Sequence, residues 1–296
     1  MNERMPSARL GDVDVAVVTL GQSPPSSTYN TEGRGLPFFQ GKADFGLLHP
    51  VPRTWCIAGQ KFARPGDVVM SVRAPVGDVN IATEDCVIGR GVAAIRAGNR
   101  TDPWFLYFAL LHSKPVLESR ASGTTFASIN RATLMDLEIP LPSKRDQRAI
   151  AHLLREVVQR VVEEQALVVR AQALKRAAMR VLFTKGLRGE AQKQTEIGPV
   201  PESWEVTELG KHIRHPDYGY AACAISEPTG PRFLRITDIQ NGRVNWDALP
   251  FCACDEKIKK DKMLKYGDIV VARIGATTGK AFLIQDDPQK QYLHRI

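Results

Sequence analysis

Apolar residues recur every three or four positions from residue 150 to residue 182, and this is the clearest periodic pattern in the chain. They are Ile150, Leu154, Val157, Val161, Val168, Ala171, Ala178 and Leu182. The pattern has one break, where Glu164 occupies an expected apolar position. Such spacing is typical of an α-helix with a single apolar stripe that packs against another helix.

The ends of this helix also have sequence signals. Ser143 is a favourable N-cap, and Asp146 three residues later completes a capping box. Lys185 and Gly186 supply a cationic last turn and a terminating glycine. The sequence therefore predicts a long helix over residues 143–185, about 65 Å long, that requires a partner helix along its stripe.

The residues before this helix alternate between short β-like runs and turns. Runs over 13–20, 68–72, 79–82 and 92–95 predict strands. Asp102 and Pro103 then precede an apolar stretch, WFLYFALL, that predicts a short buried helix running toward Pro115. We predict an α+β domain, rich in mixed β-structure, over residues 1–142.

The chain after the helix repeats part of the first domain. Residues 186–202 combine Gly, Pro and charge without periodicity and predict a linker, and Trp204 opens a second folded part over 203–296. Residues 66–69 (GDVV) match 267–270 (GDIV), with Arg73 and Arg273 following. We also align residues 36–39 with 231–234. The repeat predicts a second, partial copy of the same domain.

Composition and charge narrow the class of protein. A chain of 296 residues with 43% hydrophobic and 24% charged residues excludes fibrous and disordered classes and allows two domains. The sequence has neither an apolar run of about 18 to 20 residues nor a signal peptide, so we expect a cytoplasmic protein that makes no membrane contact. Five cysteines, an odd number, predict reduced thiols.

The net charge of +8 is concentrated in the predicted helix, where residues 143–185 contain ten Lys or Arg against four Asp or Glu. This excess indicates either a nucleic acid or acidic partner, or simply a solvated helix face.

Several motifs resemble chemical sites but lack the residues that such sites need. Residues 275–280 (GATTGK) differ from a phosphate-binding loop in spacing and lack its Ser or Thr, so a hairpin turn is the better interpretation. Cys252 and Cys254 have no second ligand pair near them, and the six histidines are scattered. No Gly-rich cofactor turn occurs. We therefore predict no catalytic residues and no metal site.

Polar and basic residues near predicted strand ends are the remaining candidates for function. Residues 123–131 (GTTFASINR) combine hydroxyl, amide and guanidinium groups suited to phosphates and base edges, although a capped turn is an equally good interpretation. The candidate DNA contacts are Lys42, Arg73, Arg90, Thr124, Thr125, Ser128, Asn130 and Arg131.

Four separated stretches carry a family resemblance. They are residues 66–82, 86–96, 123–154 and 195–210. In this order, the chain resembles the specificity subunit of type I restriction-modification systems over nearly its whole length. The resemblance implies two target recognition domains that each read one half of a split DNA site, separated by long antiparallel helices.

The resemblance also implies a non-catalytic protein with double-stranded DNA, methyltransferase subunits and a restriction subunit as partners. S-adenosylmethionine, ATP and magnesium are then expected on those subunits. Two alternatives remain open: a recognition domain from a fused methyltransferase-nuclease, or an interaction protein that no longer reads DNA.

The second domain is shorter than the first in this sequence. Sixty residues separate Ala82 from the end of the first domain, but only 12 follow the aligned Ile284. We therefore expect an incomplete second recognition domain. We also expect the stripe of the 143–185 helix to be covered by a homodimer partner or by another chain.

Overall fold

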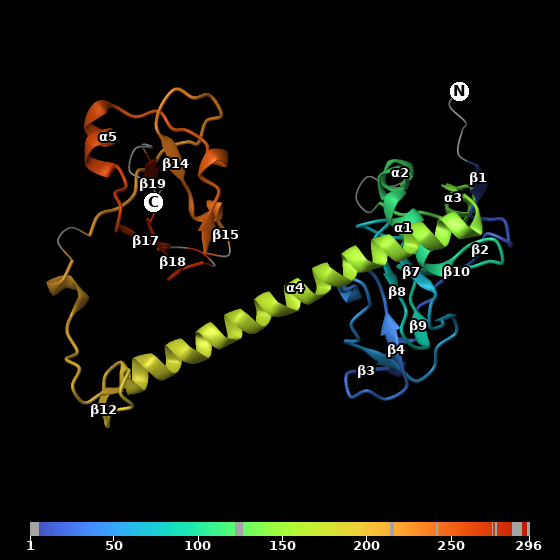
Figure 1. The fold of residues 1–296 in the computed structure, drawn as a ribbon, viewed down its shortest axis with the longest axis horizontal. Helices are drawn as coiled ribbons and strands as arrows, with labels where there is room; N and C mark the ends of the chain where they lie inside the picture. The colour runs from blue at the N-terminus through green and yellow to red at the C-terminus, as the bar shows by residue number, and fades with distance from the viewer. Residues whose placement is uncertain are drawn as a thin grey trace. The chain divides into compact units, whose positions relative to one another are not determined.

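The computed structural model describes residues 6–121, 127–213, 216–240, 242–273, 275, 277–285 and 292–294. The chain forms two compact units, residues 1–188 and 189–296 (Figure 1). Mixed sheets and one long helix confirm the predicted α+β class.

An antiparallel four-stranded sheet forms the centre of the first unit. Its strands, in spatial order, are β2 (Ala16–Leu20), β10 (Val92–Ala97), β7 (Val68–Ser71) and β8 (Val79–Ile81). All four residues of β7 are buried. Val68 and Met70 pack into the larger core, whereas Val69 packs into a second core on the other face. This sheet is therefore covered on both faces, and its apolar runs are continuous.

A five-stranded sheet covers one of these faces. Its order is β3 (Tyr29–Asn30), β5 (Trp55–Cys56), β4 (Leu36–Phe39), β9 (Cys86–Ile88) and β6 (Phe62–Ala63). Phe39 and Ile88 pack with Val69 and Ala94 of the first sheet. Several of these strands have only two residues, too few for a periodic sequence signal.

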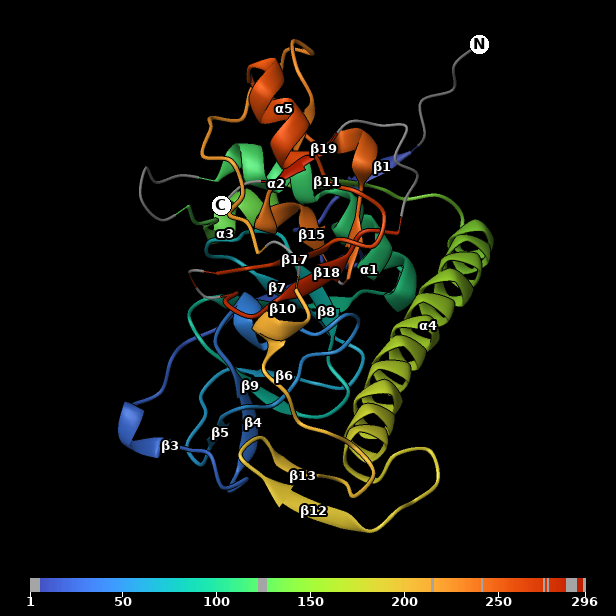
Figure 2. The same cartoon turned by 90° about the vertical axis from the view of Figure 1, so that its left-hand side faces the viewer.

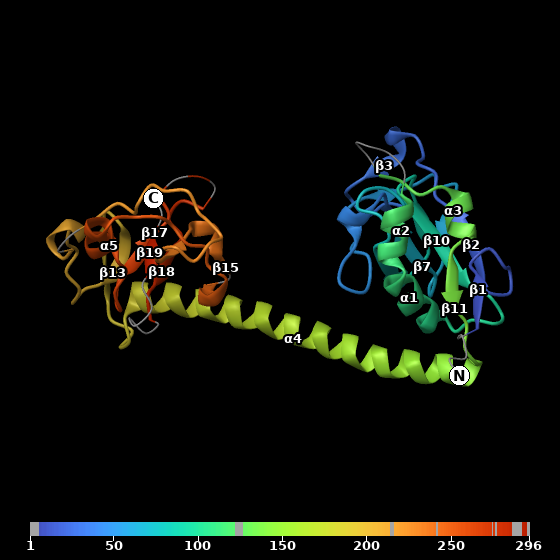
Figure 3. The ribbon, with the colours of Figure 1, turned by 90° about the horizontal axis from the view of Figure 1, so that it is seen from above.

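Helices cover the other face. Asp102 caps α1 (Pro103–His112), as its side chain accepts hydrogen bonds from the next backbone N–H groups, and Pro lies at the first position as predicted. Figure 3 shows α1 continuing into α2 (Lys114–Arg120) beside β7 and β10.

Two shorter pieces complete the domain. Helix α3 (Arg131–Met135) comes first and is followed by strand β11 (Glu138–Pro140). β11 pairs antiparallel with β1 (Ser7–Arg9). This pairing holds β1 next to the residues that lead into the long helix.

The predicted long helix is α4 (Lys144–Lys185), N-capped by Ser143 and ended by Gly186. Only its first turns pack against the domain, where Gln147 and Ala151 are buried and Leu154 and Val158 contact the core. Every residue from 163 to 183 is exposed.

Gln147 joins this helix to the domain by hydrogen bonds. Its side chain is 1% exposed. Nε2 donates to the carbonyl oxygens of Arg100 (3.0 Å) and Pro142 (2.9 Å), and Oε1 accepts from the Asp102 N–H (2.8 Å). All polar atoms of the amide are therefore directed at backbone groups on two sides of the helix start.

The second unit is built from smaller pieces. The predicted linker contains a β-hairpin, β12 (Gln192–Thr195) and β13 (Gly198–Pro201), whose turn uses the positive φ of Gly198 (Figure 2). The remaining elements are β14 (Arg232–Leu234), β15 (Ile239–Gln240), β16 (Arg243–Val244), α5 (Glu256–Lys262), β17 (Ile269–Val271), β18 (Ala281–Leu283) and β19 (Tyr292–His294).

Strand pairs of the two units correspond along the predicted repeat. β7 pairs with β8 as β17 pairs with β18, and the parallel pair β4–β9 has its counterpart in β14–β19. A glycine with a positive φ precedes each hairpin. The Gly66 N–H donates to the Ala82 carbonyl oxygen, and the Gly267 N–H donates to the Ile284 carbonyl oxygen, both over 2.9 Å. The 275–280 segment is the turn of the second hairpin, as expected, although residues 274 and 276 lie outside the described residues.

Candidate nucleic-acid interface

Loops from distant parts of the first unit meet at one edge of its sheets. The Gly89 N–H donates to the Phe39 carbonyl oxygen (2.8 Å), and the Val72 N–H donates to that of Gly91 (2.9 Å). The turn after β9 therefore lies between the loop after β4 and the loop after β7. A Cβ at Gly91 would lie 2.2 Å from the Gln40 carbonyl oxygen, so this close approach requires glycine.

A fourth segment joins this edge. The Ile129 N–H donates to the Val72 carbonyl oxygen and the Ala74 N–H to that of Ala127, both over 2.9 Å. Arg73 and Ser128 consequently form an antiparallel bridge. We call residues 40–42, 72–74, 89–91 and 127–129 together the loop cluster.

The loop cluster brings together four of the predicted DNA contacts: Lys42, Arg73, Arg90 and Ser128. Arg73 and Arg90 are exposed, and neither makes a salt bridge with any residue that the structure describes. Cations without partners at an exposed edge are available to phosphate groups.

Lys42 is held differently from the two arginines. Its Nζ lies 3.2 Å from Asp78 Oδ1, which also accepts a hydrogen bond from Lys114 Nζ (2.9 Å). This bond raises the pKa of Lys114. Because Lys42 shares a largely buried carboxylate, its first role is to tie the loop after β4 to the β7–β8 turn.

The structure describes only part of the predicted 123–131 site. Asn130 Oδ1 accepts hydrogen bonds from the Thr133 N–H (2.9 Å) and Thr133 Oγ1 (3.1 Å), so Asn130 is the N-cap of α3, in agreement with the capped-turn interpretation. Arg131 is exposed in the first turn of that helix. Thr124 and Thr125 lie outside the described residues.

A polar groove of about 690 Å³ adjoins the loop cluster at Arg90. The Arg90 N–H donates to Ser23 Oγ (3.2 Å). The groove is lined by Gln22, Ser23, Pro24, Pro25, Ser26, Tyr29, Gln60 and Arg90. Sequence reasoning missed the exposed amides of Gln22 and Gln60, because nothing local marks an isolated glutamine as part of a groove.

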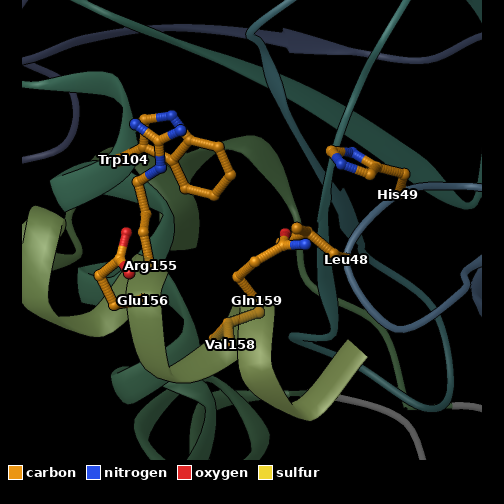
Figure 4. Close-up of a pocket in the computed structure, with 7 residues that line it drawn as sticks. All are labelled: Leu48, His49, Trp104, Arg155, Glu156, Val158 and Gln159. Carbon is orange, nitrogen blue, oxygen red and sulfur yellow. The ribbon is translucent and has the colours of Figure 1, made fainter. Parts of the chain in front are cut away.

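A smaller cavity of about 220 Å³ lies where α4 leaves the domain (Figure 4). The Arg155 guanidinium lies 4.2 Å from the centre of the Trp104 ring, which is a cation–π contact. Figure 4 shows these two side chains next to each other. Leu48, His49, Glu156 and Gln159 complete much of the wall. This stack is a second attachment of α4 to the domain, after Gln147.

The predicted stripe of α4 is exposed, with one correction. Leu154 does not belong to it, since it packs on the domain core together with Val158. The other large members remain exposed: Ile150 (40%), Val157 (54%), Val161 (43%), Val168 (53%) and Leu182 (41%). The periodicity was ambiguous here because two adjacent apolar faces merge over the first three turns.

Other kinds of site find no support in the described part of the chain. Those residues include no group of three or more His, Cys, Asp or Glu placed to hold a metal ion. They also include no helix that is both long and apolar enough to cross a membrane.

Comparisons with known proteins find similarity to type I restriction-modification specificity subunits. Residues 59–167 match the type I restriction modification DNA specificity domain. The putative type I restriction enzyme MjaX specificity subunit of Methanocaldococcus jannaschii is 42% identical over 149 residues, which cover 50% of this chain and 35% of that protein. The matched part thus spans about a third of the relative.

Two solved structures are also similar. The HsdS subunit from Thermoanaerobacter tengcongensis is 42% identical, with 63% of this chain and 46% of that chain covered and a TM-score of 0.48. The type I restriction-modification S subunit from M. genitalium is 18% identical, with 84% and 70% covered and a TM-score of 0.52, and shares the fold.

Proposed function

We propose that this chain, whose N-terminal unit carries a target recognition domain of the type I restriction-modification specificity family, reads DNA through the loop cluster and its adjoining groove. A role in DNA specificity follows from the family of the domain. The finer proposal concerns where the duplex lies and which side chains contact it.

The observation that carries the proposal is the convergence of Arg73 and Arg90. Their loops come from different strands, yet the backbone hydrogen bond from the Val72 N–H to the Gly91 carbonyl oxygen (2.9 Å) holds them at one edge. Unpaired guanidinium groups suit phosphates and the O6 and N7 edge of guanine. Ser128, Gln22 and Gln60 add neutral donors and acceptors for base edges.

DNA binding by the full chain tests this. A binding site is first selected from random duplexes, and affinity is then measured for Arg73→Ala and Arg90→Ala against increasing salt. A substitution that removes one phosphate contact is expected to lower the slope of log affinity against log salt by about 0.9. A substitution that removes a base contact is expected to cost about 1 to 3 kcal/mol on the selected site only.

Arg176→Ala is the matched control, because it removes the same charge from an exposed position of α4. If Arg73→Ala and Arg90→Ala behave like Arg176→Ala, the loop cluster is not the DNA-binding surface. If the wild type shows no sequence preference at all but still binds partner subunits, the chain is an interaction protein.

We further propose that the chain is not itself an enzyme and that methyltransferase and restriction subunits bind it, carrying S-adenosylmethionine, ATP and magnesium. The exposed, basic α4 supplies the surface for such binding. Transfer of methyl groups to DNA by the purified chain with S-adenosylmethionine alone would contradict this. Co-purification with a methyltransferase subunit, abolished by substitutions in α4, is the expected result.

A further inference from the structure

We infer that Lys42 exchanges its partner when the chain binds DNA: it pairs with Asp78 in the free chain and with a phosphate group in the complex. Lys114 keeps Asp78 paired after the exchange. This exchange rests on the proposed reading of DNA through the loop cluster. It makes Asp78 a positioning residue, which lowers DNA affinity through Lys42 without contacting DNA.

Two lysines share one carboxylate oxygen at the β7–β8 turn. Lys114 Nζ donates a hydrogen bond to Asp78 Oδ1 over 2.9 Å, and Lys42 Nζ forms an ion pair with the same oxygen over 3.2 Å. The Asp78 side chain is only 16% exposed. Because one negative charge has two positive partners, one lysine can leave without stranding a largely buried carboxylate.

Lys42 is the lysine that is free to leave. Its side chain is 40% exposed, and it follows Gly41, where an added Cβ would meet no other atom within 4 Å. Lys114 is 30% exposed and packs on the turn, since a Cβ at Gly77 would lie 3.1 Å from Lys114 Cγ. Lys42 therefore has open space beside it, whereas Lys114 is held against the turn.

The alternative partner for Lys42 is a DNA phosphate at the same edge. Lys42 belongs to the loop cluster together with the exposed Arg73 and Arg90. Ser71 Oγ accepts the Asp78 N–H (3.0 Å) at the base of the turn that carries Arg73, so the acid and this arginine are held together. A duplex bound by the two arginines presents further phosphates to this edge, because each strand carries one about every 3.4 Å along the axis.

The second unit holds its equivalent turn without a carboxylate. Asp78 and Lys280 occupy matching positions, because each directly follows a turn glycine of positive φ, Gly77 or Gly279. Lys280 Nζ donates to the carbonyl oxygen of Ile239, which follows β14 as the Lys42 segment follows β4. One lysine and a backbone carbonyl are thus enough to hold such a turn. An acid shared by two lysines exceeds this structural need, which favours a role in binding.

The exchange gives the Asp78–Lys42 pair an effect on DNA binding that a structural tie would not have. Breaking the pair opposes binding, and an exposed ion pair changes an equilibrium constant by up to about fivefold. Loss of the acid should therefore strengthen DNA binding. Loss of a purely structural tie should weaken it, so the sign of the effect separates the two roles.

Salt titrations of the full chain, on the selected duplex and on an unrelated duplex of equal length, test the exchange. Lys42→Met should weaken binding to both duplexes equally and lower the slope of log affinity against log salt by about 0.9, the value for one phosphate contact. Asp78→Asn should strengthen binding to both by about two- to fivefold. It should leave the slope unchanged, because the number of phosphate contacts stays the same.

Lys114→Met tests the lysine that remains. Asp78 then depends on Lys42 for its pairing, so Lys42 is held more firmly and DNA binding should weaken by about two- to fivefold. Asp78→Asn and Lys114→Met should each lose most of their effect in chains that also carry Lys42→Met, because both act through Lys42.

Glu84→Gln is the matched control, because it removes an exposed carboxylate from the turn before β9, at the other end of that strand from the 89–91 turn. It should leave affinity and slope unchanged. Thermal unfolding of every variant checks that the first unit is folded.

Three results would overturn the exchange. Weaker binding by Asp78→Asn would show that the pair is only a structural tie. Stronger binding that persists in full beside Lys42→Met, or that Glu84→Gln reproduces, would show a general effect of charge. If Arg73→Ala and Arg90→Ala lower the slope but Lys42→Met does not, the loop cluster reads DNA without the exchange.

Discussion

Val68 and Ile269 occupy the same position in the two repeated hairpins, yet Val68 is 1% exposed and Ile269 is 66% exposed. The difference extends across the hairpin face. Met70 (0%) corresponds to Val271 (59%). In the first unit this face packs beneath α1, which contacts β7 and β8. The same local sequence thus forms the same hairpin with or without a covering helix, because the turn glycines and backbone bonds are local.

This comparison predicts opposite effects of truncation at matched positions. Met70→Ala removes a fully buried side chain and should lower the free energy of unfolding of the first unit by about 2 to 5 kcal/mol. Val271→Ala removes an exposed one and should change stability by no more than about 0.5 kcal/mol. Denaturant unfolding followed by tryptophan fluorescence measures both. A large destabilisation in Val271→Ala would show that its face is covered in solution.

Gln147 provides a second prediction, on how α4 is attached. Gln147→Ala removes the donors to two backbone carbonyls and the acceptor for one backbone N–H. A typical hydrogen bond contributes about 0.5 to 1.5 kcal/mol net, so the loss of three should lower the free energy of unfolding of the first unit by about 1.5 to 4.5 kcal/mol. Spin labels on Glu84 and Arg176 should also show a broader distance distribution, since the helix is less firmly oriented.

Gln159→Ala is the control for this prediction. Gln159 lies three turns further along α4 and donates only to exposed Glu163. It should change neither stability nor the distance distribution. If Gln147→Ala behaves in the same way, the Arg155–Trp104 stack and the apolar contacts alone fix the helix.

Local signals predicted the elements that depend on local chemistry. The limits of α4 follow from Ser143 and Gly186, the start of α1 from Asp102 and Pro103, and the repeat from shared residues. The features that could not be predicted depend on contacts between residues that are far apart in the sequence. The pairing of Lys42 with Asp78 joins residues 36 positions apart. Leu154 was assigned to the wrong face because its spacing fits both.

The candidate site also has features that the sequence predicts and features that depend on distant contacts. Its basic residues could be nominated from their places near strand ends, but their convergence depends on backbone bonds between four loops. The groove amides Gln22 and Gln60 had no sequence signal. Asn130 was nominated as a base contact with a capped turn as the alternative, and only the Thr133 contact identifies it as a cap.

Asn130 therefore carries a prediction that separates capping from DNA contact. Asn130→Ala should lower stability by about 1 kcal/mol through loss of the cap, whereas Asn130→Ser should retain most of it. If Asn130 acts only as a cap, Ser should also preserve DNA affinity. Thermal unfolding and binding to the selected duplex are measured on both variants. Weak DNA binding by a stably folded Asn130→Ser would restore the base-contact hypothesis.

The buried thiols provide the last prediction. Burial raises the pKa of Cys86 to about 12 and that of Cys252 to about 11, whereas Cys223 is exposed. Only the thiolate reacts with iodoacetamide. At pH 8 the native chain should therefore be alkylated at Cys223, with Cys86 and Cys252 modified only after unfolding, as peptide mass spectrometry will show. Early modification of Cys86 would mean that its sheet opens readily.

The raised pKa of Cys86 also makes stability depend on pH, in a direction that can be derived. The unfolded chain loses the thiol proton near pH 9, but the folded chain retains it up to about pH 12. The stabilisation is thus complete below pH 9 and decreases as pH rises toward 12, by up to about 1.4 kcal/mol per pH unit. Cys86→Ala should flatten this decline, and Cys223→Ala should not. An equal alkaline decline in both variants would show that the Cys86 thiol does not control it.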